Sequence, residues 1–272
     1  MSGVRIVSEF GGVGHSRAAL LAVLVLAGGS SSAAAQLSFD DVLAPSARQW
    51  FELSAGVSGT ASAWSAHSSA TAALAGDLGT NGYRLRIGGG YGHYRYTRKV
   101  SDPAIHGSRW PELFGDQTWA DALIGYQWII GSTAVKVYTG FTEEDHRISP
   151  GRDFPLAVDD ENLIQGRKRG AKLVLETWSR LADWGFLQVD ASWSEPFDTY
   201  GGRLRLGYFW TGAWSAGIEA SAYQNISHDG GRAGAFVRYE RNGSELSWSI
   251  GLDGDRDRIG SGYSSVAFTV RF

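Results

Sequence analysis

Histidine and serine side chains are the candidates for nucleophilic catalysis in this sequence, but their spacing selects no catalytic pair. A barrel enzyme acting on envelope lipids would need a serine within hydrogen-bond reach of a histidine, and a third polar group to orient that histidine. His93 and His146 are separated by 53 positions, and serines such as Ser192 are scattered along the chain. The absence of cysteine excludes thiol nucleophiles, disulfides and cysteine-ligated metals. We therefore predict no catalytic residue, no cofactor and no metal site.

Two further patterns resemble ligand-binding motifs without the context that such motifs require. The glycine-rich run at 88–92 lies inside an alternating segment, not before a helix, so it predicts bending or close approach of strands and not a phosphate loop. Asp253, Asp255 and Asp257 have the carboxylate spacing of a calcium loop but lack the rest of that motif. We interpret this run as a solvated loop that could bridge to lipopolysaccharide through divalent cations.

Composition narrows the class of protein. The 272 residues include 25 basic and 28 acidic side chains, and a formal charge of −3 gives no basic excess for nucleic acid. An apolar fraction of 43% excludes a disordered chain, and 37 glycines without a Gly-X-Y period exclude collagen. The mean hydropathy of −0.18 is that of a soluble protein, unless the apolar residues are arranged in a pattern that an average conceals.

The first residues are typical of a secretory signal peptide. The apolar run at 18–27 is about half the length needed to span a membrane as a helix. Basic residues precede it and small residues follow it, so we expect cleavage between Ala35 and Gln36. This divides the chain into a signal peptide at 1–35, a short periplasmic segment at 36–48 and a folded domain at 49–272.

Alternation with a period of two, typical of strands with one apolar face, runs through the folded domain. Leu204, Leu206 and Tyr208, for example, alternate with Arg203 and Arg205. No window shows a sustained helical period. The pattern predicts twelve strands, at 49–59, 67–77, 83–98, 117–129, 133–146, 168–179, 184–194, 199–210, 214–224, 232–240, 245–253 and 262–272.

Three tight turns, at 131–132, 211–213 and 242–243, set the register of three predicted hairpins. They pair apolar residues on one face: Tyr126 with Val137, Leu206 with Ile218, and Val237 with Trp248. On the other face they set Arg205 opposite Glu219, and Tyr138 opposite Gly125, where an aromatic ring can shield a strand glycine. A slip of one residue would exchange the two faces, so agreement at three turns supports the hairpins.

The connections and aromatic residues favour an all-β fold, an antiparallel transmembrane β-barrel of about 12 strands with up-and-down topology. Short turns are predicted to alternate with longer connections, of which 99–116 and 147–167 are the longest, as in outer-membrane barrels. A soluble β-sandwich would explain the strands but neither this asymmetry nor the C-terminal Phe272. Two aromatic belts are predicted near the membrane surfaces, one of Trp128, Trp178, Trp184, Trp210 and Trp214, the other of Trp119, Phe141, Trp193 and Tyr200.

If the apolar face meets lipid, the other face lines the barrel interior. That face carries charges of both signs, which must pair if they are buried. They form either a bracing network that plugs the barrel or a charged path for solutes, and strand count alone does not decide between these. The candidates are Arg84, Arg86, Asp121, Lys136, Glu176, Asp190, Arg203, Arg205, Glu219 and Arg238.

Inward aromatic residues could stack on sugar rings, or could simply fill space beside interior glycines. These possible glycan-stacking residues are Tyr138, Trp178, Phe209 and Phe236. The sequence pattern favours the space-filling interpretation, because Tyr138 faces Gly125 in the register set by the turn at 131–132.

Four stretches of the sequence resemble the BcsS family of exported, cellulose-biosynthesis-associated proteins of alphaproteobacteria. They are 81–92 (NGYRLRIGGGYG), 120–128 (ADALIGYQW), Glu144-Asp145-His146 and 197–200 (FDTY), and the resemblance covers about 49–272. It implies a cellulose or exopolysaccharide context, and it carries over no catalytic residues.

These observations predict an outer-membrane β-barrel accessory to bacterial cellulose biosynthesis, export or anchoring. The expected partners are outer-membrane lipid and lipopolysaccharide, and cellulose or other components of the cellulose synthesis machinery, with no nucleic acid. One alternative is a general small-solute outer-membrane channel, similar to a porin. The other is a barrel enzyme acting on envelope lipids.

Overall fold

The computed structural model describes residues 48–272 except 98–99, 103–106, 110–111, 151–163, 227–228 and 256–257. The predicted signal peptide at 1–35, and the segment at 36–48 apart from its last residue, lie outside the described residues. No helix in the described ranges is long and apolar enough to cross a membrane.

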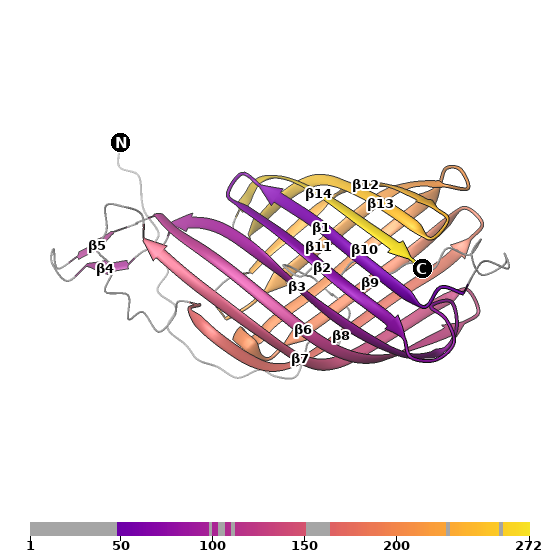
Figure 1. Cartoon of the computed structure of the whole chain (residues 1–272). Helices are drawn as coiled ribbons and strands as arrows, with labels where there is room; N and C mark the ends of the chain where they lie inside the picture. Colours follow the sequence, from indigo (N-terminus) through magenta and orange to yellow (C-terminus); the bar gives the residue numbers. More distant parts are fainter. Residues whose placement is uncertain are drawn as a thin grey trace, which may run out of the picture.

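Twelve antiparallel strands close into one barrel, in which each strand pairs with its neighbours in the chain and the first pairs with the last (Figure 1). The barrel strands are β1 (Phe51–Thr60), β2 (Ala63–Ala73), β3 (Gly82–Thr97), β6 (Glu112–Ile130), β7 (Thr133–Pro150), β8 (Gly166–Ala182), β9 (Gly185–Ser194), β10 (Thr199–Phe209), β11 (Trp214–Gln224), β12 (Asp229–Arg241), β13 (Ser244–Asp255) and β14 (Arg258–Arg271). The short strands β4 (Val100–Asp102) and β5 (Gly107–Arg109) form a separate hairpin, and η2 (Pro196–Asp198) is a single 3-10 turn. The predicted fold class is confirmed.

The register of the three hairpins is the one that the turns predict. Tyr126 pairs with Val137, Leu206 with Ile218, and Val237 with Trp248. Local turn chemistry explains the two-residue turn at 242–243. Asn242 and Gly243 have φ of 53° and 73°, the left-handed conformation that such a hairpin turn needs.

The second strand differs from its predicted position at 67–77. It spans Ala63–Ala73, because pairing with β1 decides a register that its alanines and serines leave open. A tight turn at 61–62 joins the two strands, and the Thr60 hydroxyl accepts hydrogen bonds from the Ser62 and Ala63 amides there. The connection from β2 to β3 is therefore longer than predicted and covers 74–81.

The two long connections are shorter than predicted, spanning 98–111 and 151–165 instead of 99–116 and 147–167. Strands β6, β7 and β8 extend past the apolar part of the wall, because outward-facing charges continue their alternation and pair across strands. Arg169 pairs with Glu143 in this way, and Arg167 lies 3.3 Å from the same carboxylate.

The outer surface of the barrel is apolar between its two ends. We call the end with the turns 74–81, 131–132, 183–184, 210–213 and 242–243 the turn end, and the opposite end the loop end (Figure 1). Ile87, Ile124 and Ile218 are more than 40% exposed on this surface, as expected for side chains in contact with lipid. Two predicted belt members are inside instead, because Trp178 shares the face of Glu176, and Trp119 that of Asp121.

Candidate functional site

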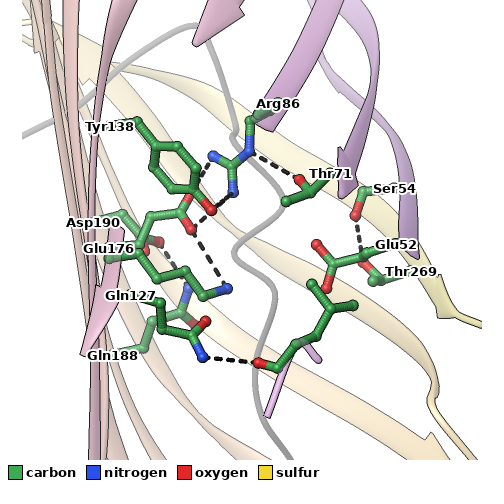
Figure 2. Close-up of polar contacts among 12 residues, drawn as sticks. Glu52, Ser54, Thr71, Arg86, Gln127, Tyr138, Glu176, Gln188, Asp190 and Thr269 are labelled. Atoms are coloured by element: carbon green, nitrogen blue, oxygen red, sulfur yellow. Dashed lines mark hydrogen bonds and ion pairs between the residues drawn. The ribbon is translucent and has the colours of Figure 1, made fainter. Parts of the chain in front are cut away.

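A buried ion pair between two strands that are not neighbours stands at the centre of the barrel interior. The Arg86 guanidinium on β3 donates hydrogen bonds to both carboxylate oxygens of Glu176 on β8, at 2.5 and 3.0 Å. The same guanidinium lies 4.1 Å above the ring of Tyr138 and donates to the Thr71 hydroxyl at 3.2 Å. Figure 2 shows Arg86, Tyr138 and Glu176 pointing toward one another inside the barrel. Lys136 completes the group, 3.8 Å from Glu176.

A second group of charges joins the first and last strands. Arg271 on β14 donates to Glu52 on β1 at 3.0 Å, and both side chains are 2% exposed. Glu240 lies 3.6 Å from Arg271 and 3.1 Å from Arg238, so the ion pairs continue onto β12. Closure of the barrel therefore buries a row of alternating charges. These ion pairs stabilise the junction between the first and last strands only when those two strands pair.

The remaining candidate charges also form close pairs. Asp190 accepts hydrogen bonds from Arg203, the nearest at 2.8 Å, and Glu219 accepts from Arg205 at 2.7 Å, as the turn register predicts. The second oxygen of Glu219 accepts from the Tyr263 hydroxyl at 2.7 Å. Nearer the loop end, Lys172 pairs with Asp121 at 2.6 Å. Charges can be buried in a barrel interior because each one is paired in this way.

An aromatic cluster fills the interior on the side of β8–β12. Trp178, Phe186 and Phe236 are each less than 5% exposed, and Phe209 packs against them. Arginine guanidinium groups cover three of these rings, that of Arg238 lying 4.5 Å from the Phe186 ring centroid. These cation–π contacts tie the aromatic cluster to the ion pairs.

The connection at 74–81 folds into the turn end and closes the opposite side of the interior. Leu78 is 5% exposed, and its carbonyl accepts a hydrogen bond from the Gln127 amide at 2.8 Å. The Arg84 guanidinium donates to the carbonyls of Asp77 and Thr80, at 2.8 and 2.6 Å. The space between Leu78 and the ion pairs has no room for a water molecule. Side chains of the described residues thus fill this part of the barrel.

Two of the cavities in the described structure lie beside these tightly packed side chains. One of about 230 Å³, here called the turn-end cavity, lies between the aromatic cluster and the turn at 210–213. Its lining includes Trp178, Arg180, Asp183, Phe209, Arg238 and Glu240. The other holds about 40 Å³, room for a few waters, beside His67, Trp119 and Lys172 toward the loop end.

The two histidines considered for catalysis have carboxylate and tyrosine partners instead of serine. His93 faces outward and lies 3.0 Å from Asp116. His146 is buried, 3.3 Å from the Tyr94 hydroxyl and 3.9 Å from Glu144. Among the described residues, no hydrogen bond joins either histidine to a serine, and no group of three His, Asp or Glu side chains could hold a metal.

The structure places all fourteen candidate residues inside the barrel. The ten charged residues lie in or beside the ion-pair groups, except that Arg84 holds the connection at 74–81. Tyr138 lies under Arg86, whereas Trp178, Phe209 and Phe236 belong to the aromatic cluster. Sequence reasoning missed Leu78, Gln127, Phe186 and Glu240. Alternation could have identified Phe186 and Glu240, but nothing local indicates that Leu78 turns inward.

Comparison with solved structures finds bacterial outer-membrane barrels. The KdgM porin is 10% identical, with a TM-score of 0.46 over 81% of this chain and 99% of that one. The transport unit of the autotransporter AIDA-I from Escherichia coli is 10% identical, with a TM-score of 0.45 over 85% and 92%. The beta domain of the Bordetella autotransporter Brka is 15% identical, with a TM-score of 0.45 over 83% and 100%. No curated protein matches the sequence.

A family model gives the clearest assignment. The model of the cellulose biosynthesis protein BcsS matches residues 53–272, nearly the whole folded domain, and confirms the resemblance carried by the four stretches above. The chain therefore belongs to the BcsS family of cellulose biosynthesis proteins and folds as a closed antiparallel β-barrel.

Proposed function

We propose that this protein is exported by its N-terminal signal peptide, spans the outer membrane, and holds or guides cellulose at that membrane without conducting it through the barrel. The turn end then faces the periplasm and the loop end the cell exterior, as in bacterial barrels with short periplasmic turns. The partners of this role are outer-membrane lipid and lipopolysaccharide on the apolar surface, and cellulose or the synthesis machinery at the barrel ends.

The observation that carries the proposal is the filled interior. A polymer passing through the barrel would have to displace the Arg86–Glu176 pair, the Glu52–Arg271 pair and Leu78 together. Each buried pair is costly to break, on the order of 3–5 kcal/mol when one partner is left alone. Family membership supplies the link to cellulose, and the filled interior favours an anchoring or assembly role over export through the barrel.

Deletion of the gene in a cellulose-producing host tests this proposal. We expect altered cellulose yield, fibre structure or attachment to the cell surface, restored by the wild-type gene. We also expect restoration by a variant with a lipid-facing change such as Val137→Leu, which serves as a matched control. Unchanged cellulose in all three measurements would contradict the proposal. Membrane fractionation checks the location, since recovery in the soluble periplasmic fraction would contradict an outer-membrane barrel.

A gated small-solute channel is the second candidate, and the connection at 74–81 is the observation that favours it. One turn, held by Arg84 and Gln127, closes one side of the interior, so its movement could open a path past the ion pairs. Planar-bilayer recordings of the purified protein separate the two candidates. Discrete conductance steps of the wild type would favour the channel, and a flat trace would favour the closed barrel.

We infer no enzymatic activity for the barrel. The inference is supported by the partners of His93 and His146, since neither histidine has the serine contact that a barrel lipase or deacylase would need. Incubation of the purified protein with lipopolysaccharide, followed by mass spectrometry of lipid A, tests this. Loss of an acyl chain would contradict it.

A further inference from the structure

The turn-end cavity combines aromatic surface with charged groups of both signs. Trp178 and Phe209 form part of its wall, and Arg180, Asp183, Arg238 and Glu240 line it as well. Its volume of about 230 Å³ is somewhat below the roughly 300–1,000 Å³ of ordinary small-molecule sites, so it suits a single ring better than an extended chain.

The charges around the cavity are balanced. Two basic and two acidic side chains line it, and the Arg238 guanidinium lies 3.1 Å from Glu240. Arg271, which also lies 3.6 Å from Glu240, has a carboxylate partner of its own in Glu52, so the local positive charge is compensated within the barrel. An anionic ligand would find no excess of positive charge here. A neutral ligand with hydroxyl groups can both donate to the carboxylates and accept from the guanidinium groups.

One donor beside the cavity is unused. Arg238 is 3% exposed, and its Nη1 atom has no hydrogen-bond partner in the protein, whereas its Nε donates to the Ser215 hydroxyl at 3.2 Å. A buried donor without a partner is costly, so it is normally satisfied by a water or a ligand oxygen. The Nη1 atom itself is enclosed by protein, so an oxygen in the cavity would reach it only if the guanidinium group turned toward the cavity.

We propose that the turn-end cavity binds one sugar ring of a neutral glucan. The ring would pack against Phe209 and Trp178, and its hydroxyls would contact Arg238, Arg180 and Asp183. The choice of a glucan rests on the proposed function, while the aromatic and balanced polar lining is independent of it. Of the four predicted glycan-stacking residues, Trp178 and Phe209 then serve this role, and Tyr138 and Phe236 fill the interior.

Titration calorimetry of the purified protein in detergent micelles tests the proposal with cellohexaose as the probe. For contact with one ring we expect a Kd on the order of 1 mM. Phe209→Ala should weaken binding roughly tenfold, as the loss of one stacked ring does elsewhere. Asp183→Asn, on an exposed turn where folding is not at risk, should weaken it about threefold. Trp210→Ala is the matched control, because that ring is 70% exposed on the outer surface at the same end.

Three results would overturn the proposal. The absence of cellohexaose binding would mean that the cavity holds only water. Binding that survives both Phe209→Ala and Asp183→Asn would place the sugar elsewhere. Oligogalacturonate bound more tightly than cellohexaose would make the ligand an anion. These failures are separate from failure of the proposed function, because gene deletion could still alter cellulose without a sugar in this cavity, and binding could persist where deletion has no effect.

Discussion

Replacing Glu176 by glutamine tests whether the barrel interior depends on paired charge. The change keeps the shape of the side chain but removes the carboxylate that, among the described residues, accepts hydrogen bonds from Arg86, whose side chain is 4% exposed. Arg86 would retain the hydroxyls of Thr71 and Tyr138, at 3.2 and 3.3 Å, and the face of the Tyr138 ring. Lys136 would lose the carboxylate that lies 3.8 Å away.

The expected cost follows from this geometry. Removing one partner of a buried pair typically destabilises a protein by about 3–5 kcal/mol. Because the amide oxygen can still accept one hydrogen bond, we expect the lower part of that range, about 3 kcal/mol, for Glu176→Gln. Glu143→Gln is the matched control, since its partner Arg169 is 74% exposed and such surface pairs contribute about 0–1 kcal/mol.

Guanidinium titration of protein folded in lipid vesicles, followed by tryptophan fluorescence, measures the free energy of unfolding. A double variant, Arg86→Met with Glu176→Gln, should be more stable than Glu176→Gln alone, because it removes the unpaired guanidinium. The reasoning is refuted if Glu176→Gln costs less than about 1 kcal/mol, the scale of an exposed pair. It is equally refuted if the double variant is less stable than Glu176→Gln alone.

Three further changes test whether the connection at 74–81 plugs the barrel, how tightly the wall is packed, and whether the outer surface faces a membrane. Leu78→Gly combined with Arg84→Ala should release the connection at 74–81 and produce discrete conductance steps in planar bilayers, and a trace as flat as wild type would contradict the plug. Gly125→Ala should cost about 1–3 kcal/mol in the same titration because its Cβ would overlap the ring of the facing tyrosine, whereas Gly212→Ala, in open space, should cost little. Ile218→Arg, at a position 64% exposed on the outer surface of the barrel, should cost about 2–4 kcal/mol in vesicles, and no loss would argue against a membrane-facing surface.

Much of the barrel wall could be predicted because it depends on local patterns. The alternation of Leu204, Leu206 and Tyr208 with two arginines separates the outer face from the interior, and the Asn242-Gly243 turn sets a register within a few residues. Where the local pattern was weak, the prediction was wrong. The alanines and serines of β2 left its position open until pairing with β1 decided it.

The candidate site was only partly predictable, since its contacts join strands that are not neighbours. The pair of Arg205 and Glu219 follows from one turn, because β10 and β11 are adjacent. The pair of Arg86 and Glu176 crosses from β3 to β8, and no turn relates those strands. Its geometry depends on the diameter and stagger of the closed barrel, which twelve strands set together.

The sequence by itself determined that a wall of paired strands forms, which face of it is apolar, and which charges and rings lie on the other face. Period-two alternation and turn chemistry act over a few residues, so they can be recognised in the sequence without knowledge of the fold. Only the tertiary structure decided that this interior is filled instead of open. Closure brings Glu52 to Arg271 and folds Leu78 inward, and those contacts exist only once the first strand meets the last.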